Sequence, residues 1–313
     1  MNSKDIDKAA VIGAGTMGHS IALIFARAGI EINLVDVDEK ALKVADERMR
    51  HALATLEDVG VIEKGRTGEI RSLIHTSLDL ASCAGEADFV VEAVPEVPEI
   101  KKQVFAQLDK VCPEQAVIAS NTSGLDIFEF TEMERPERLI IAHWFAPPHI
   151  IPLVELVPGP STSQRVVEFT ASLLERLGKV PVVMKGFTRA FIVNKIQNMI
   201  SMAVFDLLGS GLASPEDIDR AVKYSLGIRL PILGVVQTLD FTGLDLVLDL
   251  GKSYGLSLPL IEEKVEKGHL GVKTSKGLYD YGHRSESEIL ARRDALFLKM
   301  LERLKELKAF DPI

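Results

Sequence analysis

Cysteine and tryptophan are scarce in this chain of 313 residues, which has two cysteines and one tryptophan. The two thiols, Cys83 and Cys112, cannot build a disulfide scaffold or a metal site made of several cysteines, so both are excluded. Such sparing use of cysteine suits a reducing compartment. We therefore predict a cytoplasmic protein without a metal.

Long apolar runs are also missing, since none approaches the roughly 18 residues of a membrane span. Residues 1–8 include acidic side chains and no apolar segment, so we expect no signal peptide. Basic residues number 36 against 45 acidic ones, for a net charge of −9. This balance disfavours broad binding of nucleic acid, although a local basic pocket for a small anionic ligand remains allowed.

The composition is otherwise that of a globular protein, with 47% hydrophobic and 26% charged residues. That apolar fraction is enough for a sizeable core, which excludes disorder as the main state. The length favours two domains.

The first half alternates short apolar runs with longer helical patterns. The runs that we predict as strands are residues 9–12, 32–35, 89–94, 116–120, 139–142 and 180–184. Between them, residues 16–28, 38–59 and 98–111 read as helices. Runs that are apolar on both faces and separated by helices predict a parallel sheet covered on both sides.

After residue 184 we find no convincing strand. The patterns predict a largely apolar, buried helix at 191–208, a helix start at 214–217, and further helices at 241–254 and 285–308. We therefore predict an α/β fold, with a Rossmann-type doubly wound sheet in residues 1–185 followed by an all-helical domain in residues 186–313.

A glycine-rich turn links the first predicted strand to the first predicted helix. It reads Gly13-Ala14-Gly15-Thr16-Met17-Gly18. In this motif the first glycine permits a tight turn, the second admits a pyrophosphate, and the third lets helix and strand pack closely. The motif alone is a weak signal, but here it has a strand before it and a helix after it.

Asp36 ends the next predicted strand, 18 residues beyond Gly18. A carboxylate there accepts hydrogen bonds from ribose hydroxyls and repels a 2′-phosphate, so we predict NAD rather than NADP as the cofactor. The alternative is an ordinary glycine turn with a solvated aspartate.

A histidine and a carboxylate stand at later strand ends. His143 follows one strand, and Glu155 lies 12 residues further along. Together they could form a general base and its orienting acid. Ser123 follows another strand, where a helix N-cap is the alternative reading. His75, His149 and His269 have no such support, and we interpret them as surface or packing residues.

The predicted apolar helix at 191–208 carries one polar stripe. Asn194, Gln197, Asn198 and Ser201 share a face. Such a stripe indicates a cleft, water or a partner chain; an interhelical hydrogen-bond network is the alternative for the last three.

The sequence resembles the 3-hydroxyacyl-CoA dehydrogenase family over nearly its whole length. The resemblance lies in GAGTMG, VVEAVPE, SNTSGL, HWF-x-PP, PLVELV, FIVNKI and KTSKGLYDY, in that order. Several ordered motifs are far more specific than the glycine turn alone.

The resemblance implies an NAD-dependent dehydrogenase of a small-molecule substrate. His143 would be the base and Glu155 its orienting partner, while Ser123 and Asn194 would bind the reacting oxygen. Glu96, Lys101 and Asn121 would lie near the cofactor, beside Gly13, Gly15, Thr16, Met17, Gly18 and Asp36. The family also implies a homodimer formed through the helical half.

Four departures from the family pattern lie on the substrate side. Ala146 replaces Asn, Arg189-Ala190 replaces Pro-Gly, Gly234-Val235 replaces Gly-Pro, and Gln237 replaces Glu. Arg189 could clamp a carboxylate or phosphate of the substrate; a surface arginine paired with a nearby acid is the alternative.

These departures leave the substrate open. An acyl-CoA such as 3-hydroxybutyryl-CoA is favoured over a free hydroxy acid of the gulonate, carnitine or pyridine type. A non-catalytic, crystallin-like protein is the third alternative.

Overall fold

The structure is a computed structural model, and it describes residues 6–311. The chain separates into two compact units, Met1–Met199 and Ile200–Ile313, which we call the N-terminal and C-terminal units. The division falls inside a helix, α8 (Val193–Ser210). The predicted domain boundary after residue 185 stays a prediction.

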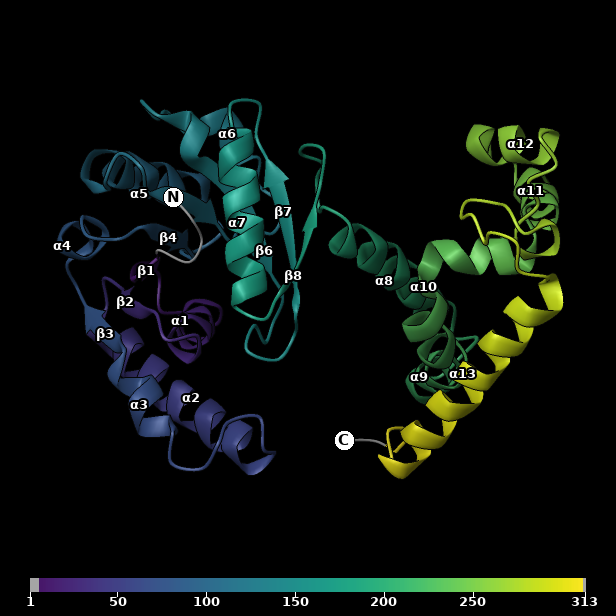
Figure 1. The fold of residues 1–313 in the computed structure, drawn as a ribbon, viewed down its shortest axis with the longest axis horizontal. Coiled ribbons are helices and arrows are strands. Elements are labelled where there is room, and N and C mark those ends of the chain that lie inside the picture. The colour runs from purple at the N-terminus through teal and green to yellow at the C-terminus, as the bar shows by residue number, and fades with distance from the viewer. Residues whose placement is uncertain (1–5, 312–313) are drawn as a thin grey trace. The chain divides into compact units, whose positions relative to one another are not determined.

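The N-terminal unit is built on one sheet of eight strands in the order β3-β2-β1-β4-β5-β6-β7-β8 (Figure 1). The strands are β1 (Lys8–Ile12), β2 (Glu31–Val35), β3 (Ile74–Ser77), β4 (Phe89–Glu92), β5 (Val117–Ser120), β6 (Leu139–Trp144), β7 (Leu153–Pro158) and β8 (Val180–Val183). The order reverses direction between β1 and β4, as in a doubly wound Rossmann-type sheet. The predicted fold class is therefore confirmed.

One pair of strands departs from the predicted parallel sheet. β7 runs antiparallel to β6, and residues 145–152 connect the two strands. The predicted strands do not include β3 or β7. An antiparallel neighbour needs only a short connection, so no intervening helix marks it in the sequence.

Helices cover both faces of the sheet. They are α1 (Gly18–Arg27), α2 (Glu39–Asp58), α3 (Thr67–Ser72), α4 (Leu80–Ala84), α5 (Pro98–Val111), α6 (Ile127–Phe130) and α7 (Gln164–Arg176). Successive residues of β1 point to opposite sides: Ala9 and Val11 join one core cluster, and Ala10 and Ile12 join the other. The first cluster includes α1, α2 and α7, and the second includes α4, α5 and α6.

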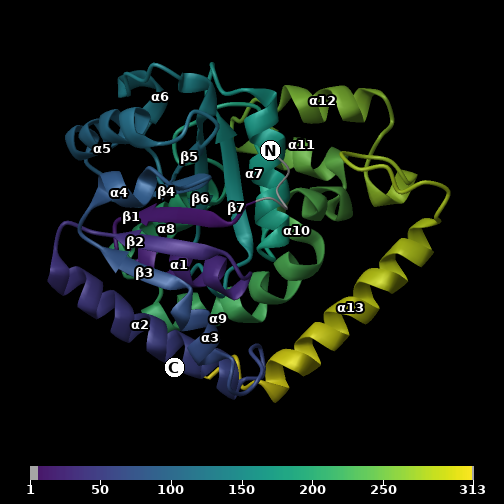
Figure 2. The same cartoon turned by 60° about the vertical axis from the view of Figure 1, so that its left-hand side comes forward.

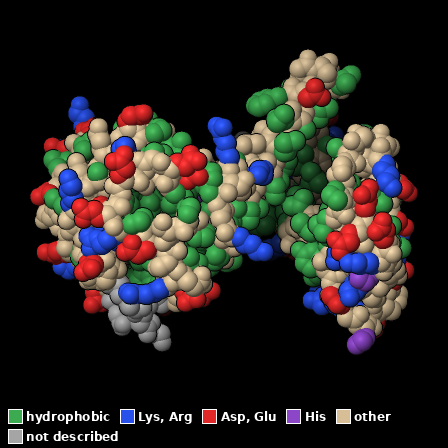
Figure 3. Space-filling model, turned by 90° about the horizontal axis from the view of Figure 1, so that it is seen from above, with side chains coloured by type: hydrophobic (Ala, Val, Ile, Leu, Met, Phe, Trp, Pro, Cys, Tyr) green, Lys and Arg blue, Asp and Glu red, His purple; other side chains and the backbone are tan. Residues whose placement is uncertain are grey.

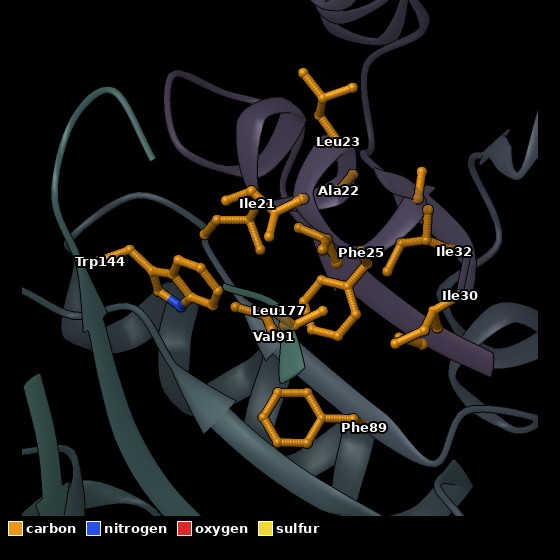
Figure 4. Packing of buried hydrophobic residues seen from close by; sticks show 14 of the residues in the cluster. Ile21, Ala22, Leu23, Phe25, Ile30, Ile32, Phe89, Val91, Trp144 and Leu177 are labelled. Atoms are coloured by element: carbon orange, nitrogen blue, oxygen red, sulfur yellow. The ribbon is translucent and has the colours of Figure 1, made fainter. Parts of the chain in front are cut away.

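Aromatic packing anchors α1 on the first face. Figure 4 shows Phe25 of α1 beside Phe89 of β4, and their ring centroids are 6.0 Å apart. Trp144 of β6 lies in the same cluster, next to Ile21 in this view. The contact between Phe25 and Phe89 holds the last turn of α1 against the beginning of β4.

The C-terminal unit contains helices and no named strand among its described residues. The helices are α9 (Pro215–Tyr224), α10 (Leu226–Thr242), α11 (Leu244–Ser253), α12 (Pro259–Glu266) and α13 (Glu286–Glu306). Figure 2 shows α13 as one long rod. Ser214 caps α9 by accepting from the N–H of Asp217, and Ser285 begins α13 in a capping box with Glu288.

Two expectations for the helical half are wrong. The helix predicted at 241–254 breaks at Gly243, whose φ of +94° lies in the left-handed region that favours glycine. The helix predicted as buried, α8, has no buried residue. Its apolar side chains are exposed instead: Met199 is 63% exposed and Phe205 71%.

Among residues 6–311, no single helix is long and apolar enough to cross a membrane. α10 and α11 satisfy the criterion of length and composition only when taken together, and they are bent by 83°. The predicted cytoplasmic location stays a prediction.

Candidate functional site

The glycine turn has the shape that a pyrophosphate requires. Gly13 has a φ of +105°, and a Cβ on it would lie 2.5 Å from the carbonyl oxygen of Ala93. A Cβ on Gly18 would overlap the carbonyl oxygen of Gly13. A Cβ on Gly15 would meet nothing within 4 Å, so this glycine faces open space. The turn therefore leaves room for a ligand beside the N-terminus of α1, whose N–H groups favour an anion.

Asp36, directly after β2, is hydrogen-bonded to the same turn. Its Oδ2 accepts a hydrogen bond from the N–H of Ala14 at 2.8 Å, and its Oδ1 accepts from the N–H of Asp38 at 3.0 Å. The carboxylate therefore stands at the edge of the glycine turn, where the predicted ribose contact requires it.

His143 and Glu155 are brought together by the antiparallel pairing of β6 and β7. The two residues are register partners, so their side chains point to the same face of the sheet. Nδ1 of His143 donates to Oε2 of Glu155 at 2.9 Å. A carboxylate can only accept, so Nδ1 carries the proton and Nε2 is the nitrogen that remains for a ligand.

Glu155 is fully buried and uses both of its oxygens. Oε1 accepts from the N–H groups of Ile192 and Val193 at 3.0 and 2.9 Å. Burial raises the pKa of Glu155, but the hydrogen bonds from His143 and from these two amides outweigh it, so the pKa lies below its ordinary value. The carboxylate therefore stays ionised beside the imidazole.

The segment that supplies those amides has an unusual backbone. Ala190 and Phe191 have φ of +67° and +49°, a region that favours glycine. Ala190 stands where the family has Gly, so this departure carries a conformational cost. The bend seats Phe191 against His143, with ring centroids 5.2 Å apart, while Phe145 lies 4.5 Å away. Two aromatic rings thus confine the imidazole.

Glu96 organises the loop after β5. Its Oε1 accepts from Oγ1 of Thr122 at 2.7 Å and from the N–H of Ser123 at 2.8 Å; Oγ of Ser123 lies at 3.3 Å. Burial raises the pKa of Glu96, but the bond from Thr122 and the charge of Lys101 more than compensate, and the pKa is lowered. The loop that carries Ser123 is held by an ionised carboxylate.

Lys101 lies behind this loop. Its Nζ bonds Oε1 of Glu92 at 2.7 Å and lies 3.2 Å from Oε2 of Glu96. Lys101 is 1% exposed and does not line the cavity described below. Oε2 of Glu92 in turn accepts from Oγ of Ser120 at 2.5 Å. The sequence pointed to Lys101 through the family motif and overlooked Glu92, although VVEAVPE contains it.

Most of the predicted residues share one cavity of 610 Å³ in the N-terminal unit. Those that line it are Gly13, Gly15, Thr16, Met17, Asp36, Glu96, Asn121, Ser123, His143 and Asn194. Trp144, Phe145 and Ala146 line it as well. Gly18, Lys101 and Glu155 do not line this cavity and lie behind its wall. Arg189 is exposed and does not line this cavity, so its role stays a prediction.

The cavity has the groups that a dinucleotide and an alcohol oxidation need. An open glycine turn and Asp36 stand at one part of its wall, and an oriented imidazole and the Ser123 hydroxyl stand at another. Among residues 6–311, the acidic side chains on its wall are Asp36 and Glu96, and no lysine or arginine lines it.

Comparison with known families matches both halves of the chain. The model of the 3-hydroxyacyl-CoA dehydrogenase NAD-binding domain matches residues 8–187, and that of the C-terminal domain of the same family matches residues 191–281.

Individual relatives carry different names. The chain is 29% identical to 5-formyl-3-hydroxy-2-methylpyridine 4-carboxylate 5-dehydrogenase of Mesorhizobium japonicum, over 91% of this chain and 94% of the relative. It is 32% identical to the human lambda-crystallin homolog, over 73% and 72%. The crystal structure of the 3-hydroxyacyl-CoA dehydrogenase of Archaeoglobus fulgidus is similar with a TM-score of 0.78 and 33% identity, covering 95% of this chain and 99% of that one.

Proposed function

Because the chain belongs to the 3-hydroxyacyl-CoA dehydrogenase family and is an NAD-dependent oxidoreductase, we propose that it oxidises the hydroxyl of a 3-hydroxyacyl-CoA to the 3-keto compound. The observation that carries the proposal is the bond between His143 and Glu155, on the wall of the cavity that also holds the glycine turn.

His143 is the general base of the proposed reaction. Its Nε2 takes the proton of the substrate hydroxyl, while the carbinol C–H bond breaks and its electron pair leaves with the hydrogen as hydride. Bound NAD supplies the hydride acceptor. The electrons of the broken O–H bond form the carbonyl, so the substrate loses one proton and one hydride.

Glu155 orients this base. Its carboxylate holds Nδ1–H, fixes the tautomer with Nε2 unprotonated, and stabilises the positive charge that His143 gains. Its other oxygen is tied to the backbone of Ile192 and Val193, so the pair cannot drift. We assign Glu155 as a positioning residue rather than a proton acceptor.

Ser123 and Asn194 hold the reacting oxygen in this proposal. Both line the cavity with His143. The side-chain amide of Asn194 can donate to the reacting oxygen, whereas the one hydroxyl proton of Ser123 is directed at Glu96, so its oxygen can accept from the substrate hydroxyl. The amide and hydroxyl bonds from Ser123 to Glu96 restrict where its hydroxyl can lie. For the cofactor, the glycine turn with Thr16 and Met17 would hold the pyrophosphate and Asp36 the ribose, while Glu96 and Asn121 would face the nicotinamide half.

The direct test is NADH formation, followed by absorbance, with NAD and four alcohols: 3-hydroxybutyryl-CoA, free 3-hydroxybutyrate, gulonate and carnitine. We expect turnover with the CoA thioester and at least about tenfold lower kcat/KM with each free acid. Tight NAD binding without turnover of any member would overturn the dehydrogenase proposal and favour the crystallin-like alternative.

A free hydroxy acid is the second candidate. It is favoured by Arg189, which precedes the helix carrying Asn194 and replaces a proline of the family pattern, and by the relative whose name is that of a pyridine carboxylate dehydrogenase. Arg189→Met then raises KM for the acid by about tenfold or more and leaves KM for NAD unchanged. An unchanged KM for every accepted substrate removes this role of Arg189.

We also propose that the chain forms a homodimer through the apolar face of α8. This face includes Met199, Met202 and Phe205, which are 63%, 63% and 71% exposed. Contiguous exposed apolar side chains of this kind mark association surfaces. Sedimentation should show about twice the 34.3 kDa mass of the chain, and a 34.3 kDa species at all concentrations would reject the dimer.

A further inference from the structure

The C-terminal unit has a cavity that the proposed reaction does not use. Its volume is 250 Å³, and it lies between the second half of α10 and the first half of α13. It shares no lining residue with the cavity at the glycine turn. α13 lies beyond residues 191–281, which are the part of the chain that the model of the family's C-terminal domain matches. One wall of this cavity therefore comes from a segment that the family model does not cover.

Charge on the wall has one sign. Arg284, Arg292 and Arg293 line the cavity, and among residues 6–311 no aspartate or glutamate does. The chain as a whole has more acidic than basic residues, and Figure 3 shows the two kinds interspersed on the face in view. A wall with three cations and no acid favours an anion.

Arg293 is held in one orientation by its neighbours. Its Cζ lies 5.4 Å from the ring centroid of Phe241 and 5.8 Å from that of Phe297. Its Nε and Nη2 both contact Oδ1 of Asp294, at 2.8 and 2.7 Å, and Asp294 does not line the cavity. These contacts do not use Nη1, so its two N–H groups are left for a ligand.

The other two arginines also keep donors. Nε of Arg284 donates to the carbonyl oxygen of Tyr281 at 2.9 Å, which leaves the two Nη groups. Arg292 is exposed and makes no ion pair within the described part of the chain. The carboxylate of Glu288, whose pKa is influenced by Arg284, accepts from the N–H and the hydroxyl of Ser285, each at 2.7 Å. Both arginines therefore have N–H groups available to an anion.

Gln237 keeps a negative charge off this wall. It lines the cavity, and it is one of the four departures from the family pattern, which has Glu at this position. A glutamate there would place a carboxylate on the same wall as the three arginines and would compete with an anionic ligand. The buried Asp240 is already paired, since it accepts from the hydroxyl of Tyr281 at 3.0 Å and does not line the cavity.

The rest of the wall is apolar. Leu233 and Phe241 come from α10, and Ile289 and Leu296 come from α13. A cavity of 250 Å³ is smaller than most pockets for drug-sized ligands, so it admits a single ring or a short branched chain. Cations beside such a wall suit a ligand that has an anionic head and a compact apolar body.

We propose that this cavity binds a compact organic anion, a carboxylate or phosphate carried on a ring or a short branched chain. Arg284, Arg292 and Arg293 bind the head, and the apolar side chains of α10 and α13 contact the body.

Calorimetric titration of the full chain, without NAD or substrate, tests the site independently of the proposed function. Phenyl phosphate and benzoate are the probes and separate the two head groups; benzyl alcohol lacks the charge, and inorganic phosphate lacks the ring. We expect saturable binding of at least one of the two aromatic anions with a Kd below about 1 mM, and at least about tenfold weaker binding of benzyl alcohol and inorganic phosphate.

Two variants locate the binding. Gln237→Glu introduces the carboxylate of the family pattern and weakens binding by about tenfold or more. Arg292→Gln removes an exposed member of the three cations and weakens binding by about fivefold or more. The matched control is Arg303→Gln, which removes an exposed charge from the other end of α13 and leaves the Kd unchanged.

Absence of saturable binding of both aromatic anions overturns the proposal. So does binding that Gln237→Glu or Arg292→Gln leaves unchanged, because the anion would then bind elsewhere on the chain, or binding of benzyl alcohol as tight as that of benzoate. Circular dichroism of each variant checks that the helices are retained.

Discussion

The two units use apolar residues in opposite ways. In the N-terminal unit, a sheet covered by helices on both faces buries two extended clusters. In the C-terminal unit, each of the two clusters has only three buried members. α10 is rich in apolar residues, yet its one buried residue is Asp240.

The contrast shows that apolar composition predicts burial only where the fold supplies a covering surface. Each strand of a doubly wound sheet has helices on both sides, so its side chains are covered whichever way they point. A helix that is apolar on all sides needs neighbours on every side. The C-terminal unit exposes Val235 and Val236 at 52% and 50%, and Phe205 at 71%.

A matched pair of truncations gives the largest expected effect. Phe89→Ala in the N-terminal core costs about 3–5 kcal/mol in the free energy of unfolding, because it leaves a cavity between α1 and the sheet. Phe205→Ala on α8 costs less than about 0.5 kcal/mol. Urea unfolding followed by far-ultraviolet circular dichroism and by fluorescence of the single tryptophan, Trp144, measures both.

Any loss in the free energy of unfolding caused by Phe205→Ala should grow with protein concentration, because this residue lies in the interface of the proposed dimer. If the two variants lost equal free energy of unfolding at every protein concentration, the proposed difference in burial between the units would be wrong.

The next largest effect tests whether the chemistry belongs to the N-terminal unit. His143→Gln removes the proposed base, so kcat falls about 10³-fold while the Kd of NAD, measured by calorimetry, is unchanged. His75→Gln on β3 is the control, since that imidazole is 52% exposed and lies 3.3 Å from Glu31, away from the cavity. Retained turnover in His143→Gln would place the base elsewhere.

Glu155→Gln should have a smaller effect, a fall of about 10²-fold in kcat/KM. The variant should also lose the part of the pH dependence of stability that the ionised Glu155 supplies. The folded pKa of Glu155 is lowered, so its contribution to stability is present above its ordinary pKa of 4.5 and is lost as the pH falls through the folded value. An unchanged kcat/KM in Glu155→Gln would remove Glu155 from the proposed mechanism, and an unchanged dependence of stability on pH would contradict its lowered pKa.

The smallest expected change concerns the cofactor. Asp36→Asn removes the negative charge beside the ribose site and reduces the preference for NAD over NADP by about tenfold, measured as the ratio of the two kcat/KM values. Asp38→Asn two residues later, where the side chain caps α2, serves as the control and keeps the ratio. A preference unaffected by Asp36→Asn would remove Asp36 from the selection of the cofactor.

Features encoded by neighbouring residues were predictable. The turn from Gly13 to Gly18 and the helix starts at Ser214 and Ser285 are short patterns whose geometry depends on a few φ angles and local bonds. The doubly wound sheet and the use of NAD followed from these patterns in series, and both are confirmed.

Features that depend on pairing across the fold were not predictable. The antiparallel pairing of β7 with β6 makes His143 and Glu155 register partners, and no local pattern contains that pairing. The burial of Lys101 depends on how α5 packs beside the end of β4, which brings its ammonium to Glu92 and Glu96. Exposure of α8 depends on how many elements surround it.

The sequence by itself determined the family, the cofactor and the residue types of the site, because the glycine turn and the ordered motifs are local and specific. Only the tertiary structure decided which side chains face the cavity and which lie behind its wall. The reason is physical: side-chain distances and burial are set by packing between segments far apart in the chain, and a linear pattern does not contain those distances.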